Sequence, residues 1–114
     1  MENICQPKPV KMLMVIVDRG KGKKIIKMLN DFGLGYTFAA YGTGTASTEI
    51  RTYFGLEESQ RDIVFGIVPQ EKSKDIMDLL NEKLKLRKPN TGIAFTIPIK
   101  CVSSMLALKY MLEQ

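Results

Sequence analysis

The chain of 114 residues contains no histidine, no tryptophan and only two cysteines. Histidine is the usual general base and the commonest metal ligand, so its absence argues against a Cys/His nucleophile and against structural zinc. We therefore predict no catalytic residues and no metal site. Cys5 and Cys101 are expected to be reduced thiols without a special role, as in most cytoplasmic proteins.

Long apolar runs are also missing. No stretch reaches the roughly 18 residues of a membrane span, and the opening Met1-Glu2-Asn3 lacks the basic and then apolar pattern of a secretory signal. We expect a cytoplasmic protein that is not integral to a membrane. With 45% hydrophobic and 25% charged residues, the chain predicts a single globular domain over residues 1–114.

One pattern in the sequence occurs twice. A short apolar run, 15–18 or 66–69, is followed by apolar residues at helical spacing, and a further strand candidate follows each helix. The apolar helix positions are Ile25, Ile26, Met28 and Leu29 in the first copy and Ile76, Met77, Leu79 and Leu80 in the second. The element order is therefore βαββαβ.

This order predicts an α+β, ferredoxin-like sandwich, in which two helices cover one face of a four-stranded antiparallel sheet. The strands are expected at 11–17, 36–42, 62–68 and 92–99, the helices at 22–32 and 71–86, an extended arm at 1–10 and a short tail helix at 102–112. The uncovered sheet face should carry Met12, Met14, Phe65 and Phe95. Such an apolar face favours covering by another subunit.

Capping and helix-breaking residues predict where the helices begin and end. Gly33 should stop the first helix, and Pro89 should prevent the second from continuing. Ser73 or Gln70 is placed to start the second helix. Ser103 and Ser104 can cap the tail helix.

The net charge of +5 is concentrated in two basic clusters. The first comprises Arg19, Lys21, Lys23, Lys24 and Lys27, and the second comprises Lys83, Lys85, Arg87 and Lys88. One interpretation is a solvated helix face, with the second cluster favourably placed at a helix C-terminus. The other is an anion site where both clusters meet a glycine-rich loop.

That loop, 43–62, follows Gly42 and is longer than a hairpin needs, which is typical of binding or switching segments. Gly42 and Gly44 allow the backbone to approach a ligand closely. Thr45 and Ser47 supply hydroxyl groups, and successive amides can form an anion-binding nest.

The chain resembles the P-II nitrogen-regulatory signal-transduction family, especially its divergent, short-loop members, over about residues 11–99. The residues that carry the resemblance are the doubled strand-helix unit, Tyr41-Gly42-Thr43-Gly44, Ile67-Val68-Pro69 and the run from Arg87 to Phe95. The resemblance implies a homotrimer with small-molecule sites, usually for adenine nucleotides, in clefts between subunits. It also implies that the loop 43–62 regulates a target protein, which can be a transporter, an enzyme or a regulator.

Two departures from the family leave the cofactor open. Typical members place a lysine directly after the glycine of the second ligand-facing loop, where this chain has Ile93 after Gly92. They also carry arginines after the last strand, where this chain has 101–104, Cys-Val-Ser-Ser. The absence of these cations weakens the expectation that the chain binds ATP. The predicted ligand-binding residues are Arg19, Lys21, Gly42, Gly44, Thr45, Ser47, Arg87, Lys88, Asn90, Thr91 and Gly92.

Two alternatives remain open from the sequence. An RRM-like RNA-binding module shares the element order, but its third strand should be aromatic and basic, whereas 62–68 is aliphatic apart from Phe65. We therefore expect no nucleic-acid partner. The other alternative is a different small-molecule binder on the same fold. An enzyme would have to rely on carboxylates such as Asp18 or Glu49, each of which is more simply a turn or cap residue.

Overall fold

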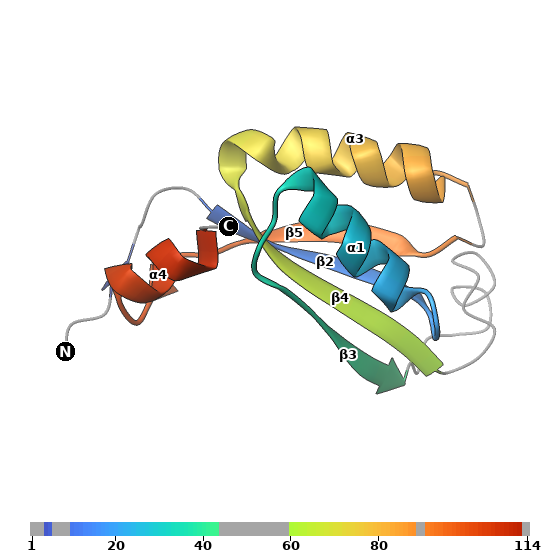
Figure 1. Ribbon diagram of the computed structural model, residues 1–114, viewed down its shortest axis with the longest axis horizontal. Coiled ribbons are helices and arrows are strands. Elements are labelled where there is room, and N and C mark those ends of the chain that lie inside the picture. Colours follow the sequence, from blue (N-terminus) through green and yellow to red (C-terminus); the bar gives the residue numbers. More distant parts are fainter. Residues whose placement is uncertain (1–3, 6–9, 44–59, 89–90, 113–114) are drawn as a thin grey trace.

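The computed structural model describes residues 4–5, 10–43, 60–88 and 91–112. Four strands form an antiparallel sheet in the order β3-β4-β2-β5. Their bounds are β2 Val10–Asp18, β3 Thr37–Thr43, β4 Gln60–Pro69 and β5 Ile93–Pro98. Helices α1 (Gly22–Phe32) and α3 (Ser73–Leu84) lie side by side on one face of the sheet (Figure 1). The predicted α+β, ferredoxin-like fold is confirmed.

The core lies between this sheet and the two helices. Leu13, Val15 and Val17 alternate along the central strand β2 and are almost completely buried. They pack in one cluster with Ile25 and Leu29 of α1, Ile76 and Leu80 of α3, and Val64 and Val68 of β4. The helical spacing of those apolar residues thus places one stripe of each helix on the sheet.

The opposite face of the sheet is not covered by α1 or α3, and most of its residues are apolar. Met14 pairs with Phe65 on one side and with Phe95 on the other, and Phe38 pairs with Phe65 across the next strand pair. The rings of Phe38 and Phe65 are stacked with centroids 4.9 Å apart, and Phe38 remains 46% exposed. The expectation that Met12, Met14, Phe65 and Phe95 share this face agrees with the observed register.

Helix α1 has the bounds that the sequence predicts. Gly33 ends it with φ of 121°, and its N–H donates to the carbonyl oxygens of Leu29 and Asn30. A side chain would be strained in this left-handed conformation, so glycine is the residue that can close the helix here.

Helix α3 differs from its predicted range of 71–86. A 3₁₀ turn, η1 (Gln70–Lys72), precedes it, and the helix begins at Ser73, in agreement with the expected start, although its N-cap, Lys72, makes no side-chain cap hydrogen bond. The helix ends at Leu84, well before Pro89, because Lys85 takes a left-handed conformation with φ of 54°. The helix thus ends two residues before the predicted residue 86, and the backbone of Lys85 ends it before Pro89 is reached.

The chain termini hold the other departures from expectation. Part of the predicted extended arm forms a strand, β1 (Ile4–Cys5), which pairs with β6 (Cys101–Val102) and sets Cys5 opposite Cys101. Cys101 is disulfide-bonded, so the expectation of reduced thiols is wrong. The tail helix α4 (Met105–Leu112) begins three residues later than the predicted residue 102, because Val102 belongs to β6. The expected serine cap is present, since the N–H of Ala107 donates to Ser104 Oγ over 3.0 Å.

No helix in the described ranges is long and apolar enough to cross a bilayer.

The left-handed Lys85 leads to a prediction about stability. Lys85→Gly and Lys85→Ala both remove the charge, but only glycine relieves the strain of a side chain at positive φ. The glycine variant should therefore be more stable than the alanine variant by about 1 kcal/mol in urea unfolding. Equal stability of the two variants would show that Lys85 is not held in this conformation.

Candidate functional site

One end of the sheet gathers the segments that the sequence marks as functional. The turn from β2 into α1, the end of β3, the start of β4, the end of α3 and the start of β5 all lie there (Figure 1). The described ends of the loop 43–62 therefore meet the first basic cluster. Local contacts show how they are held.

Asp62 at the start of β4 caps helix α1 from outside the helix. Its Oδ2 accepts hydrogen bonds from the backbone N–H groups of Gly20 (2.8 Å) and Gly22 (2.9 Å). The helix itself provides no such group, because Lys21 occupies the N-cap without a side-chain bond and the first turn holds no acidic residue. A carboxylate at this position is favoured by the positive end of the helix dipole.

Gly22 is required by this arrangement. A Cβ at residue 22 would lie 2.9 Å from Oδ2 of Asp62, which is shorter than a tolerated contact. The helix can therefore begin against the carboxylate only because its first residue has no side chain.

Arg19 connects the same carboxylate to both ends of the loop. Its Nε lies 3.5 Å from Oδ1 of Asp62, an oxygen that accepts no hydrogen bond within the described residues. Its Nη2 donates to the carbonyl oxygens of Gly42 (3.2 Å) and Arg61 (3.3 Å), and Nε also donates to Arg61 O (3.3 Å). The guanidinium stands 4.3 Å from the ring centroid of Tyr41. Arg19, predicted to contact a ligand, thus makes extensive contacts within the chain.

Asp18 and Arg61 form a second ion pair next to the first. They are opposite each other in the pairing of β2 with β4, with Arg61 Nη1 3.7 Å from Asp18 Oδ1. The Arg61 side chain is only 5% exposed and also donates to the carbonyl oxygen of Gln60 over 2.7 Å. The loop base is therefore fixed by two neighbouring charge pairs.

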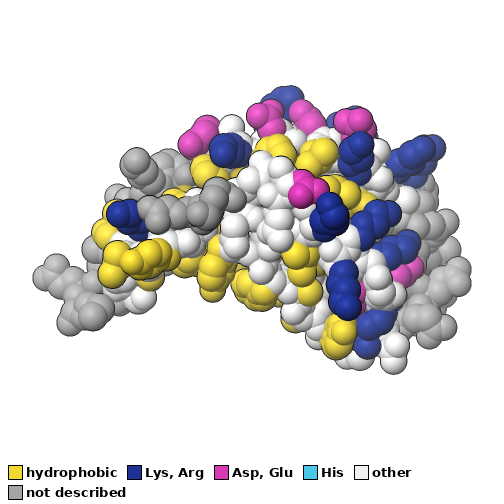
Figure 2. Space-filling view, viewed as in Figure 1, with side chains coloured by type: hydrophobic (Ala, Val, Ile, Leu, Met, Phe, Trp, Pro, Cys, Tyr) yellow, Lys and Arg dark blue, Asp and Glu magenta, His cyan; other side chains and the backbone are white. Residues whose placement is uncertain are grey.

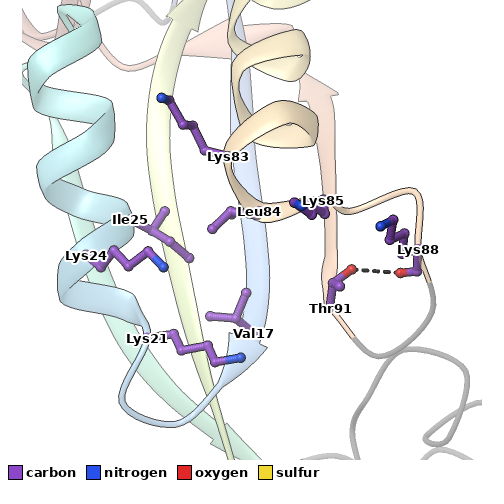
Figure 3. A pocket seen from close by; sticks show the side chains of 9 residues that line it. All are labelled: Val17, Lys21, Lys24, Ile25, Lys83, Leu84, Lys85, Lys88 and Thr91. Carbon is purple, nitrogen blue, oxygen red and sulfur yellow. Dashed lines mark hydrogen bonds between the residues drawn. The ribbon is translucent and has the colours of Figure 1, made fainter.

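Three of the predicted ligand-binding residues, Lys21, Lys88 and Thr91, line a cavity of about 260 Å³ between α1 and α3 (Figure 3). Thr91 Oγ1 donates to the carbonyl oxygen of Lys88 over 2.8 Å, which fixes the segment after α3. The cavity faces the helix side of the molecule, and Lys and Arg side chains gather at this end of it (Figure 2).

The other predicted residues do not join this cavity. Arg87 lines a different depression together with Asp78, Asn81 and Glu82. Gly92 is buried with φ of 113°, and a Cβ there would lie 2.7 Å from the carbonyl oxygen of Ile16, so packing alone requires glycine at that position. Gly44, Thr45, Ser47 and Asn90 lie outside the described residues.

Sequence reasoning missed Asp62 and Arg61, whose contacts hold this end of the sheet. A signal was present, because Asp18-Arg19 ends the first strand and Arg61-Asp62 begins the third strand of the repeat. In the antiparallel pairing, Asp18 lies directly opposite Arg61, while Asp62 lies opposite Val17 and contacts Arg19, which follows the end of β2.

Comparison with known proteins supports the fold. No family model and no curated protein matches the sequence. Among solved structures, CPII from Thiomonas intermedia K12, a nitrogen regulatory PII-like protein bound to ADP, AMP and bicarbonate, matches 90% of this chain and 98% of its own with a TM-score of 0.63 and 15% identity.

Two further structures agree. A PII-like signalling protein from Thermus thermophilus matches 90% of this chain and 93% of its own, with a TM-score of 0.61 and 20% identity. The GlnK–ATP complex of B. subtilis matches 82% of this chain and 84% of its own, with a TM-score of 0.56 and 14% identity. The chain thus has the PII-like fold that the resemblance implied.

The contacts of Arg19 and Asp62 lead to a prediction about the loop base. In a double-mutant cycle of Arg19→Gln and Asp62→Asn, we expect a coupling energy of about 1–3 kcal/mol from urea unfolding, because the carboxylate is nearly buried. The control is the cycle of Lys27→Gln and Asp31→Asn, whose side chains are 77% and 68% exposed. It should give at most about 0.5 kcal/mol. Equal couplings would contradict the structural role of the Arg19–Asp62 pair.

Proposed function

We propose that the protein is a PII-like regulator rather than an enzyme. It forms a homotrimer, senses a small anionic metabolite or nucleotide in clefts between its subunits, and regulates a partner protein through the loop 43–62. The proposed setting is cytoplasmic, in nitrogen metabolism. The metabolite is held at the sheet end that contains Arg19 and Gly42, together with the segment 87–92.

The observation that carries this proposal is the attachment of the loop to the rest of the site. Arg19 bonds to Gly42 and Arg61, one on each side of the loop, and pairs with Asp62, which also holds the turn into α1. A ligand that moves this turn therefore changes the anchoring of both loop ends. A partner that binds the loop can sense that change.

The structural neighbours support the ligand class. One carries ADP, AMP and bicarbonate, and another is a complex with ATP. All of these are anions, in keeping with the positive charge at the same end of this chain. The missing lysine after Gly92 favours weaker phosphate binding than in members with the full set of cations.

The apolar sheet face favours a protein partner over RNA. The described strand residues on that face include Met12, Met14, Ile16, Phe65, Phe95 and Ile97. Among the described strands, Arg61 is the one cationic residue that shares this face, and its side chain is buried at the sheet end and paired with Asp18. An RNA-binding sheet needs accessible cations beside its aromatic rings to hold the phosphates. Here the exposed lysines gather over the helices instead (Figure 2).

We predict a mass three times that of the 12.9 kDa chain in light scattering at micromolar concentration. Met14→Lys places a charge at the centre of the apolar face and should shift the mass to that of a monomer, because burial of an unpaired ammonium is costly. Lys11→Glu, on the helix side of the same strand, is the control and should leave the mass unchanged. A monomeric wild type would refute the trimer.

Binding of nucleotides provides the test of function. Titration calorimetry with ATP, ADP and AMP should detect binding of at least one of them, and Arg87→Gln should weaken it roughly 10- to 100-fold through loss of a charge-assisted hydrogen bond. Lys72→Gln, at the other end of α3, changes the net charge equally and should have little effect. If none of the three binds, the adenine nucleotide is excluded as the ligand.

A further inference from the structure

The cavity between α1 and α3 has an unusual lining. Five of its nine residues are lysines, namely Lys21, Lys24, Lys83, Lys85 and Lys88, and none is acidic. Val17, Ile25 and Leu84 form its apolar part, and Thr91 adds a hydroxyl group. Figure 3 shows Lys21 and Lys24 reaching from α1 toward α3, while Lys83 reaches back toward α1.

These charges are not neutralised within the described part of the chain. None of the five lysines makes an ion pair there. Elsewhere on the same helices, Lys27 pairs with Asp31 and Lys74 pairs with Asp78, each one turn apart. The lysines of the cavity are all solvent-exposed and instead face one another across it, so their like charges give the empty site a positive potential that salt screens in part.

Helix electrostatics account for only two of the five lysines. Lys83 and Lys85 lie at the C-terminus of α3, where the helix dipole favours cations. Lys21 and Lys24 lie at the N-terminus of α1, where the dipole opposes them; the carboxylate that caps this end, Asp62, is already paired with Arg19. The lysines from both helices therefore add to one positive potential in the cavity.

The conformation of Lys85 gives independent support. It takes a left-handed conformation, φ 54°, at a C-cap where glycine is the preferred residue. Glycine there would relieve the strain but would remove an ammonium group from the cavity. Strained side chains of this kind concentrate at functional sites.

We propose that this cavity binds a di- or triphosphate group, either as a free anion or as part of a larger metabolite. Several lysines around one small cavity favour a compact ligand with several negative charges. Phosphate groups meet this requirement, because an ammonium group attracts phosphate oxygens as a point charge. The volume suits a group of that size rather than a whole dinucleotide. All nine lining residues belong to one chain, so the proposal does not require the trimer. Because Lys21, Lys88 and Thr91 are also predicted ligand-binding residues, it rests on the proposed function in one respect, and it names the chemical group that this part of the site holds.

The test is titration calorimetry of the full chain with sodium pyrophosphate. Lys24→Gln combined with Lys83→Gln should weaken binding at least about 10-fold, because each ammonium contributes a charge-assisted hydrogen bond. The control combines Lys23→Gln with Lys72→Gln, two exposed lysines that do not line the cavity. It changes the net charge equally and should weaken binding less than about 3-fold, the effect of long-range attraction alone.

Further titrations distinguish the sources of the phosphate group. If the group belongs to a nucleotide, ATP competes with pyrophosphate and is weakened by the cavity variant. If the group is a free anion, ATP does not compete and the cavity variant leaves ATP binding unchanged. Both results support the cavity, provided that Arg87→Gln leaves pyrophosphate binding intact.

The proposal is overturned if wild type does not bind pyrophosphate, or if the cavity variant and its control weaken binding to the same extent. Sulfate, at the same concentration, should bind more weakly because it carries less charge. Pyrophosphate binding without any nucleotide binding would refute the adenine ligand while leaving the cavity proposal standing.

Discussion

The carboxylate of Asp62 is the group on which the rest of this sheet end depends. It begins helix α1 by accepting the N–H groups of Gly20 and Gly22, and it balances the guanidinium of Arg19. Without it, a helix that starts with several lysines and no acid would have no negative group at its positive end. Because Asp62 belongs to β4, this capping interaction requires β4 to be in place beside β2.

This dependence joins two regions that differ in chemistry. On one side of the turn 19–22 lie the loop ends, which are held by short polar contacts to Arg19. On the other side lies the lysine-lined cavity, to which Lys21 contributes. A change in the turn therefore reaches both regions through a few consecutive peptide units. This short connection offers a contiguous route between the proposed ligand site and the loop.

Much of the fold could be predicted because it is encoded locally. The glycines at both ends of α1 and the alternation of residues in β2 are visible in the sequence. They allowed the helix and the strand to be predicted correctly. The end of α3 could not be predicted, because it depends on the backbone angle of Lys85 and not on Pro89. The site was predicted only in part, since the role of Asp62 and the disulfide at Cys101 depend on which distant strands pair. Strand register is a tertiary property that one sequence does not display.

The position of β2 at the centre of the sheet has a consequence for synthesis. This strand is the first of the four to be made, yet its neighbours are β4 and β5, which end at residues 69 and 98. At about 5–20 residues per second, the edge that β5 will occupy stays unpaired for roughly 4–16 s after β2 is complete. An apolar strand with open edges is a template for pairing with other chains. Strand β2, which is paired along both edges in the folded molecule, is thus the strand whose edges stay unpaired longest during synthesis.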